Sequence, residues 1–346
     1  MATCLFGLVL SVLVTLIPSL IAIAVLWWLD RYEKEPLWLL GIAFFWGAVP
    51  TIGLSLVAQL VIDVPLADAF GHSILYPLAN LSLVAPLTEE IFKALILLLL
   101  YLFYRQEFDG VMDGILYGAL IGFGFSVVED IFYLMGSLMG EGGWAEWGVV
   151  LALRVGLYNL NHSLFTACTG IGFGLARNRR AGWKRWVYPF LGLCAALFLH
   201  GLHNASTVLA ESTGGISILL ATVFDWMGVL GMLVLILVSV RQEKRWFEEL
   251  ELEIESGVIS PDEAQIASSY RARVARGWQI LKQHGLREML RWSRFVQMIV
   301  DLAYKKHQKK AAQEGAATDE RIARLREQIA RLRPELPVVG EVGQPL

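Results

Sequence analysis

Long apolar runs dominate the first 240 residues of the chain, and short polar stretches separate them. Each run is continuous rather than alternating, which favours helices over strands, and each is long enough for a helix to cross about 30 Å of hydrocarbon. Seven spans are predicted, at residues 4–29, 37–62, 75–104, 111–135, 149–176, 187–210 and 216–240. The first run has no basic segment before it and is too long for a signal peptide, so it is predicted as an uncleaved helix. The pattern therefore predicts an all-α, polytopic membrane bundle.

Lys and Arg residues are confined to alternate loops, and this sets the predicted orientation. The loops after spans one, three and five carry cations such as Lys34, Arg105 and Lys184, as does the segment after span seven, whereas the loops after spans two, four and six carry none. Cytoplasmic loops hold the excess of Lys and Arg in membrane proteins. We therefore expect the N-terminus outside and the C-terminus in the cytoplasm. Arg154, near the outer end of span five, is expected to extend its side chain outward.

Composition divides the chain at about residue 240. The chain is 56% apolar and 18% charged, against about 45–50% and about 25% in an average soluble domain. Residues 241–346 nevertheless hold 35 of the 61 charged residues. We expect a membrane domain over 1–240, a cytosolic helical tail over 241–333 and a disordered end over 334–346. A single soluble globule is excluded, and the net charge of -3 argues against a nucleic-acid partner.

The tail carries two helix signals. Ser260 followed by Pro261 and Glu263 is typical of a helix start. Near the end, apolar residues recur at spacings of three and four, at Ile322, Leu325, Ile329 and Leu332. This stripe is too short to specify an oligomer, so it predicts an amphipathic helix that packs on its neighbours. A contact between the tail and a protein partner is the alternative.

Polar side chains interrupt the apolar runs at five places. A charged group near the bilayer centre costs about 2.5–3.5 kcal/mol on insertion scales, so such residues indicate function. At about 1.5 Å per residue, the groups of spans three to six converge between the midplane and the outer third of the bilayer. From span three to span seven, the clusters comprise Glu89, Glu90 and Lys93; Glu129 and Asp130, with Phe125 one turn before; Asn159, Asn161 and His162; His200, His203 and Asn204; and Asp225. Convergence of four consecutive helices predicts a site.

The spacing of the charged residues in span three suggests different roles for the two glutamates. Glu89 and Lys93 are four residues apart and share a face, whereas Glu89 and Glu90 point about 100° apart. Lys93 is therefore expected to be the counter-ion of one glutamate, which leaves the other for chemistry. Carboxylates with histidines suit a divalent-metal site, zinc by ligand type, or a metal-free site. In the metal-free design a glutamate activates water while His and Asn stabilise an oxyanion, and the sequence leaves both designs open.

Each cluster alone also has a purely structural explanation. Glu89 with its cation can be a buried ion pair, and His162 can be a core histidine. Asp130 and Asp225 are as consistent with structure as with a site. His203 lies off the face that His200 shares with Asn204, so we expect it to support the site. All the clusters together are harder to explain by packing alone.

Small residues recur every four positions in two of the predicted spans. Gly114, Gly118 and Gly122 lie on one face of span four, and Gly170 and Gly174 repeat the spacing in span five. Such stripes let two helix backbones approach closely. They predict close helix contacts.

The ordered motifs resemble the PrsW family of intramembrane proteases, which belongs with the prenyl-protein (CAAX) endopeptidases and related immunity-type membrane proteins. The resemblance covers roughly residues 25–240 and rests on Asp30-Arg31-Tyr32-Glu33-Lys34-Glu35-Pro36, Glu89-Glu90-x-x-Lys93, Phe125-x-x-x-Glu129, His162 and His200-x-x-x-Asn204. It implies a polytopic helical protease of the bacterial cell membrane. Its substrate would be a single-pass membrane-anchored protein, in the founding case an anti-sigma factor, cut near the outer side of the bilayer.

Carried over residue by residue, the resemblance implies Glu89 as the water-activating base and Glu90 as the partner of the cation. Asn204 would help to hold the oxyanion. The implied metal-ligating or orienting groups are Glu89, Glu129, His162 and His200, and the supporting residues are Lys93, Phe125, Asp130, His203 and Asp225. The fourth-span motif of the CAAX enzymes ends in His, where Glu129 stands here. This places the chain in the PrsW branch, disfavours prenylated substrates and leaves the need for a metal open.

Two other classes of function compete with a protease. Intramembrane Glu, Asp, His and Lys also mark transporters and ion or proton pathways. Many transporters contain paired halves, and no such internal symmetry is visible in this sequence. A non-catalytic membrane scaffold that signals through its tail is the third class.

Overall fold

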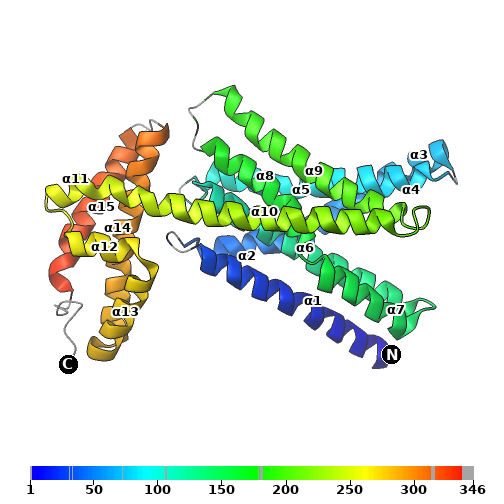
Figure 1. The fold of residues 1–346 in the computed structure, drawn as a ribbon, viewed down its shortest axis with the longest axis horizontal. Coiled ribbons are helices and arrows are strands. Elements are labelled where there is room, and N and C mark those ends of the chain that lie inside the picture. The colour runs from blue at the N-terminus through cyan, green and yellow to red at the C-terminus, as the bar shows by residue number, and fades with distance from the viewer. Residues whose placement is uncertain are drawn as a thin grey trace. The chain divides into compact units, whose positions relative to one another are not determined.

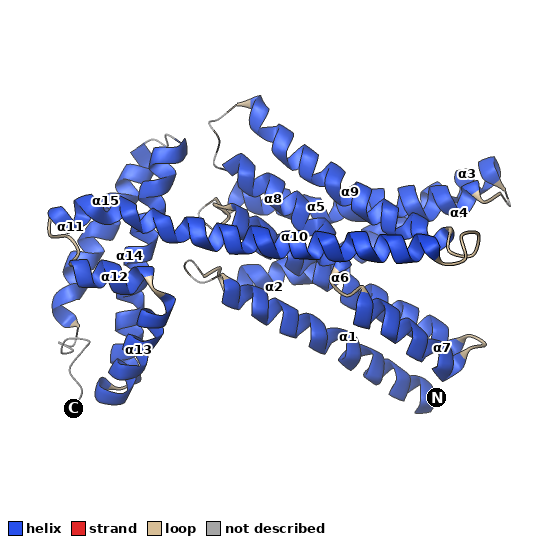
Figure 2. Ribbon diagram, in the orientation of Figure 1, coloured by secondary structure: helices blue, strands red, loops and turns tan. Residues whose placement is uncertain are grey.

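The computed structural model describes residues 2–30, 32, 34–71, 73–105, 107–177, 179, 182–312 and 316–336. Helices joined by turns make up this part of the chain, which contains no strand (Figure 2). The α-helices are α1 (Ala2–Leu29), α2 (Leu37–Trp46), α3 (Ile52–Phe70), α4 (Leu75–Ala79), α5 (Ala85–Phe103), α6 (Val111–Met139), α7 (Gly143–Val150), α8 (Asn161–Arg177), α9 (Val187–Val208), α10 (Ile216–Trp246), α11 (Glu251–Glu255), α12 (Pro261–Ser268), α13 (Tyr270–His284), α14 (Leu286–Ala312) and α15 (Ala316–Leu332). The all-α prediction is confirmed. Most of the end predicted to be disordered, from residue 337 onward, lies outside the described residues.

Five helical segments are long and apolar enough to cross a membrane. They are Thr3–Leu29, Leu37–Phe70, Val111–Met139, Trp183–Val208 and Ile216–Glu255. They correspond to predicted spans one, two, four, six and seven. Predicted spans three and five are not among these five. Span three contains a π-helical stretch and carries three charges within Glu89–Lys93, and span five is interrupted at residues 158–160. A multi-pass helical membrane protein is therefore confirmed, while the count of seven spans and the orientation stay predictions.

The chain forms two compact units (Figure 1). The first comprises residues 1–29 and 35–237, and the second comprises residues 30–34 and 238–346. The loop between α1 and α2 therefore contributes to the unit that is built mainly from the tail.

Helix α6 is the centre of the first unit. In its most apolar stretch 89% of the residues are buried, compared with 11–28% in the other four candidate spans. A methyl group added at Gly114 would lie 2.1 Å from the carbonyl oxygen of Gly170, and one at Gly122 would lie 2.3 Å from that of His162. Only glycine allows α6 and α8 to approach this closely. The predicted small-residue contact is confirmed, and it fixes the backbone of His162.

Irregular turns lead into the helices that carry the polar residues. Asn80–Val84 is a π-helical stretch that leads into α5, and Leu151–Leu157 is another that ends at Tyr158. After the break at residues 158–160, helix α8 begins at Asn161. His162 therefore lies in the first turn of a helix, inside the bundle. Such π-helical segments frequently occur at functional sites.

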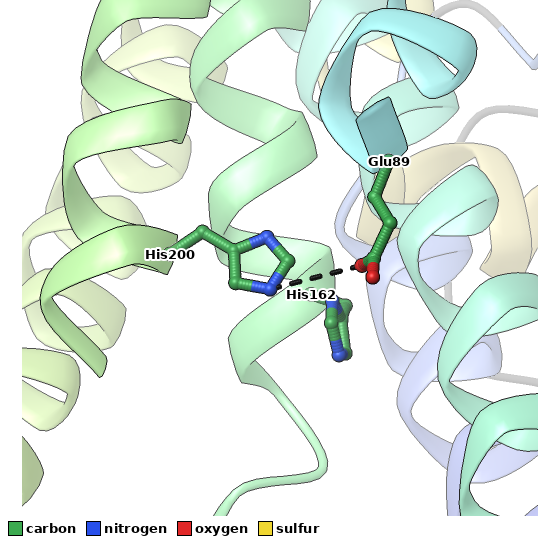
Figure 3. Close-up of side chains that lie close together, drawn as sticks. All are labelled: Glu89, His162 and His200. Atoms are coloured by element: carbon green, nitrogen blue, oxygen red, sulfur yellow. Dashed lines mark ion pairs between the residues drawn. The ribbon is translucent and has the colours of Figure 1, made fainter. Parts of the chain in front are cut away.

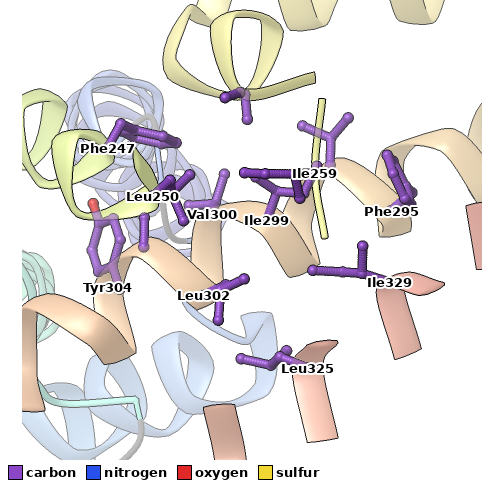
Figure 4. Close-up of a cluster of buried hydrophobic side chains, with 14 of the residues drawn as sticks. Phe247, Leu250, Ile259, Phe295, Ile299, Val300, Leu302, Tyr304, Leu325 and Ile329 are labelled. Carbon is purple, nitrogen blue, oxygen red and sulfur yellow. The ribbon is translucent and has the colours of Figure 1, made fainter. Parts of the chain in front are cut away.

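The second unit has its own hydrophobic core (Figure 4). Its centre is α14, where Phe295, Ile299 and Val300 are buried. Tyr32, from the loop between α1 and α2, belongs to this core, and its hydroxyl lies 3.3 Å from the carbonyl oxygen of Ser268. The predicted apolar stripe of the tail packs here through Ile322, Leu325, Ile329 and Leu332. The amphipathic-helix interpretation of that stripe is confirmed.

Candidate active site

One turn of α5 supplies two carboxylates and a cation. Lys93 is fully buried, and its Nζ lies 2.8 Å from Glu90 Oε1 and 3.8 Å from Glu89 Oε2. The same ammonium lies 3.8 Å from the centre of the Phe125 ring on α6. A buried charge is tolerated only with a partner at hydrogen-bond distance. Glu90 is therefore the counter-ion of Lys93, and Glu89 lies beside the pair without a short contact to it.

Both carboxylate oxygens of Glu90 accept hydrogen bonds. Oε1 accepts from Lys93 and lies 3.1 Å from His200 Nδ1, while Thr166 Oγ1 donates to Oε2 at 3.1 Å. A carboxylate that binds one ring nitrogen of a histidine fixes its tautomer and its ring orientation. Glu90 therefore holds the N–H of His200 at Nδ1 and leaves the lone pair at Nε2.

Glu89, unlike Glu90, has one carboxylate oxygen without a hydrogen-bond donor. Gln59 Nε2 donates to its Oε1 at 3.3 Å, but its Oε2 is buried and has no hydrogen-bond partner. Oε2 lies 3.7 Å from His200 Nε2, and Figure 3 shows these two atoms facing each other. Two lone-pair acceptors at this distance repel each other unless a proton, a water or a cation lies between them. Glu89 is therefore the carboxylate left for chemistry.

His162 links the α5 turn to α6. Its Nδ1 lies 3.2 Å from Lys93 Nζ, and its Nε2 lies 2.9 Å from Glu129 Oε2. The potential ligand atoms of Glu89, His162 and His200 lie within 4.8 Å of one another. One carboxylate and two imidazoles are a donor set suited to zinc, and the unsatisfied Glu89 oxygen is consistent with a bound cation. Because both nitrogens of His162 already have partners, a cation would replace one of them.

Glu129 and Asp130 both pair with Arg154, which we expected at the membrane surface. Arg154 Nε lies 2.6 Å from Asp130 Oδ1, and its Nη2 pairs with Glu129 Oε2. The prediction that Arg154 extends outward is wrong, because its guanidinium instead pairs with two adjacent carboxylates that need a positive partner. Glu129 lies outside the three-residue group, so its role as a metal ligand stays a prediction.

A second polar cluster joins α8, α9 and α10. Asp225 Oδ2 lies 2.7 Å from His203 Nδ1 and accepts from Asn161 Nδ2 at 2.8 Å. Asn204, predicted to bind an oxyanion, donates from Nδ2 to the carbonyl oxygen of Leu81 at 2.8 Å. The catalytic and supporting roles of these residues stay predictions.

A cavity of about 260 Å³ is lined by the histidines of both clusters, and Glu89 lies behind His162 and His200 rather than in its lining. Its polar lining includes Glu129, Arg154, His162, His200, His203 and Asn204. Asn159, by contrast, does not join the site, because its Oδ1 accepts a hydrogen bond from Ser19 Oγ on α1 at 3.2 Å. The cavity provides space for water and for a substrate segment beside the imidazoles.

Three residues of this network are not predicted by the sequence patterns. The patterns place Arg154 at the membrane surface, although it is the one cation in its predicted span. Thr166 lies one helical turn after His162 and could have been found by that spacing. Gln59 is a polar residue within predicted span two, and only the structure shows that it reaches Glu89.

Comparison with known proteins identifies the family. Residues 35–239, which include both polar clusters, match the model of the PrsW family of intramembrane metalloproteases. The chain is similar to the Protease PrsW of Geobacillus kaustophilus, at 29% identity over 191 residues, which are 54% of this chain and 74% of that protein. It is also similar to the Protease PrsW of Clostridioides difficile, at 27% identity over 56% of this chain and 76% of that protein.

A third relative extends the same pattern. The Protease PrsW of Bacillus subtilis is 28% identical over 51% of this chain and 72% of its own length. No solved structure matches the chain. Because the family model spans more than half of the chain, the protein belongs to the PrsW family of intramembrane proteases and is a multi-pass membrane hydrolase.

Proposed function

We propose that the protein hydrolyses a peptide bond of a single-pass, membrane-anchored protein near the outer side of the bilayer, with Glu89 activating the attacking water. The observation that carries this proposal is the buried group of Glu89, His162 and His200, with one carboxylate oxygen of Glu89 lacking a hydrogen-bond donor. A general base needs a free acceptor at the reacting centre. Glu89 Oε2 is such an acceptor.

The neighbouring residues prepare Glu89 for this role. Lys93 lies 3.8 Å from Glu89 Oε2 but pairs with Glu90 at 2.8 Å, so Glu89 is not held in a close ion pair. His200 Nε2, 3.7 Å from the same oxygen, supports the proposal because one water can hydrogen-bond to both atoms. The base and the imidazole would thus aim a single water molecule at the scissile carbonyl.

Charge that develops on the carbonyl oxygen needs donors. Asn204 lines the cavity and carries an amide N–H₂, one hydrogen of which is engaged by Leu81. In this proposal the amide turns from Leu81 toward the oxyanion when substrate binds. Removing one such donor in other hydrolases lowers the rate by about 10²–10³-fold.

In a second, metal-assisted form of this proposal Glu89 is a ligand rather than the free base. Together with His162 and His200 it would hold a divalent metal, for which zinc fits the donor types. When bound, such an ion acts as a Lewis acid that polarises the substrate carbonyl and lowers the pKa of water. Glu90 would then orient His200, and Glu129 would orient His162, each through the second ring nitrogen.

The resemblance to the PrsW family supports a proposal for the substrate class. We propose an anti-sigma-factor-like protein with one transmembrane helix. A protein partner for the cytosolic tail is a separate proposal, which does not depend on the substrate.

The test is cleavage of a reconstituted single-pass substrate, with products located by mass spectrometry. Glu89→Gln and His200→Ala are expected to abolish cleavage while the protein stays folded. Glu211→Gln changes an exposed acid of the same unit and should cleave like the unaltered protein. Undiminished cleavage by both site variants would refute the proposal.

The metal is tested separately. A chelator is expected to stop cleavage, and added zinc is expected to restore it. Full activity of chelated protein, with no metal detected by elemental analysis, would contradict the metal-assisted form and leave water activation by Glu89 as the mechanism.

A further inference from the structure

The tail contains a strongly basic helical hairpin. It consists of α13 and the first part of α14, over residues 270–294. This segment has one acidic residue, Glu288, in a chain whose net charge is -3. Its seven cations are Arg271, Arg273, Arg276, Lys282, Arg287, Arg291 and Arg294. The hairpin therefore carries a concentrated positive charge that the composition of the whole chain conceals.

The same hairpin exposes large apolar side chains. Trp278 is 59% exposed, Leu286 60% and Leu290 50%, and Val274 is also exposed. Among the described residues that follow α10, the only other exposed large apolar side chain is Leu252. Exposed apolar groups that gather on one element indicate an interaction site.

Cations and apolar groups share one face of α13. Arg271, Val274, Trp278 and Lys282 follow one another at spacings of three and four, so they lie in one row along the helix. All four are exposed. A helix face on which Trp and aliphatic side chains alternate with Lys and Arg is typical of helices that lie in the interface of an anionic membrane.

A cavity of about 450 Å³ lies beside this row. Its walls are mainly apolar and include Val274, Trp278, Leu281, Met289 and Trp292. The charged residues that line it are Lys34 and Arg273, and no carboxylate occurs among its lining residues. This lining suits a ligand with an anionic head and an apolar body. Lys34 belongs to the loop between the predicted spans 4–29 and 37–62.

We propose that the α13–α14 hairpin is a docking surface for anionic phospholipids of the cytoplasmic leaflet. The cations would bind lipid phosphates, while Trp278 and its apolar neighbours would insert among the upper acyl carbons. A second copy of this chain fits the surface less well, because two hairpins of the same charge repel each other. An RNA would satisfy the cations but would not explain the aliphatic side chains Val274, Leu286 and Leu290.

The test compares the full-length protein in nanodiscs of pure phosphatidylcholine and in nanodiscs that contain phosphatidylglycerol. Hydrogen exchange of residues 270–294 should be slower in the anionic discs. Each juxtamembrane Lys or Arg contributes about 1 kcal/mol near an anionic surface, so Arg271→Gln with Lys282→Gln should lower the ratio of docked to undocked hairpin by roughly 30-fold. Arg324→Gln, which removes an exposed cation of α15, is the matched control and should change nothing.

A second measurement keeps the test decisive if a variant fails to fold. In the unaltered protein, raising the salt concentration from about 0.1 M to about 1 M shortens the Debye length from about 10 Å to about 3 Å and should remove the lipid-dependent protection. Equal exchange in both kinds of disc would overturn the proposal. Protection that follows protein concentration, or that appears only with added RNA, would overturn it as well.

Discussion

Glu89 and Glu90 are adjacent, yet the structure predicts opposite consequences when each is replaced by glutamine. Glu90 pairs with the fully buried Lys93 at 2.8 Å, whereas Glu89 Oε2 has no hydrogen-bond donor. Glu90→Gln should therefore destabilise the protein strongly. Glu89→Gln should leave the stability almost unchanged.

The magnitudes follow from these contacts. Breaking a buried ion pair by removing one partner costs about 3–5 kcal/mol, because the other charge stays buried without compensation. Two neighbours of Lys93 remain, His162 Nδ1 at 3.2 Å and Glu89 Oε2 at 3.8 Å, and they place the cost of Glu90→Gln at the lower end, about 3 kcal/mol. Glu89→Gln keeps the Gln59 hydrogen bond through its amide oxygen, so the expected change is below about 1 kcal/mol.

A double-mutant cycle isolates the pair. Lys93→Met alone should also cost about 3 kcal/mol, but Glu90→Gln combined with Lys93→Met should cost less than the two added together by about 2–3 kcal/mol. The free energy of unfolding is measured by titration from mild detergent into denaturing detergent, with Glu211→Gln as the control. The reasoning is refuted if Glu90→Gln is as stable as the unaltered protein, or if Glu89→Gln is the more destabilised of the two.

Three further predictions concern packing, charge and pH. A methyl group at Gly122 would lie 2.3 Å from the carbonyl oxygen of His162, so Gly122→Ala should lower the unfolding free energy by about 1–3 kcal/mol and slow cleavage, whereas Gly136→Ala, with nothing within 4 Å, should not. Arg154→Gln leaves Glu129 and Asp130 without a cation and should destabilise by about 1–3 kcal/mol in the same titration, whereas Arg154→Lys should recover part of the loss. Burial lowers the pKa of His307 below its ordinary value, so the unfolded tail takes up a proton more readily. Tail stability should therefore fall as the pH drops below about 6.5. Protection of α14 from hydrogen exchange measures this loss, which should be smaller in His307→Gln.

The helical fold and the polar cluster were predictable because both depend on local sequence. A long apolar run must be helical in a bilayer, where each backbone polar group needs an internal partner. Depth along such a helix is set by residue count, so the sequence alone places Glu89, His162 and His200 at one level. The glycine stripe of α6 was also predictable, because the spacing alone indicates close contact with another helix.

The remaining features depend on tertiary contacts. Nothing in the sequence indicates that Arg154 turns inward, since the orientation of its side chain depends on which carboxylates face it from α6. The break at residues 158–160, which places His162 in the first turn of α8, has no proline to mark it. Tyr32 joins the core of the tail although more than 200 residues separate it from Phe247 and Phe295, and only the fold brings such residues together.

The central claim is that Glu89 is the base of this intramembrane protease. The most direct test is the single-turnover rate of cleavage of a single-pass substrate by Glu89→Gln, measured beside its unfolding free energy. The rate should fall by about 10²–10⁴-fold, the usual contribution of a general base, while the stability changes by less than about 1 kcal/mol. Cleavage at an undiminished rate by the folded variant would contradict the claim.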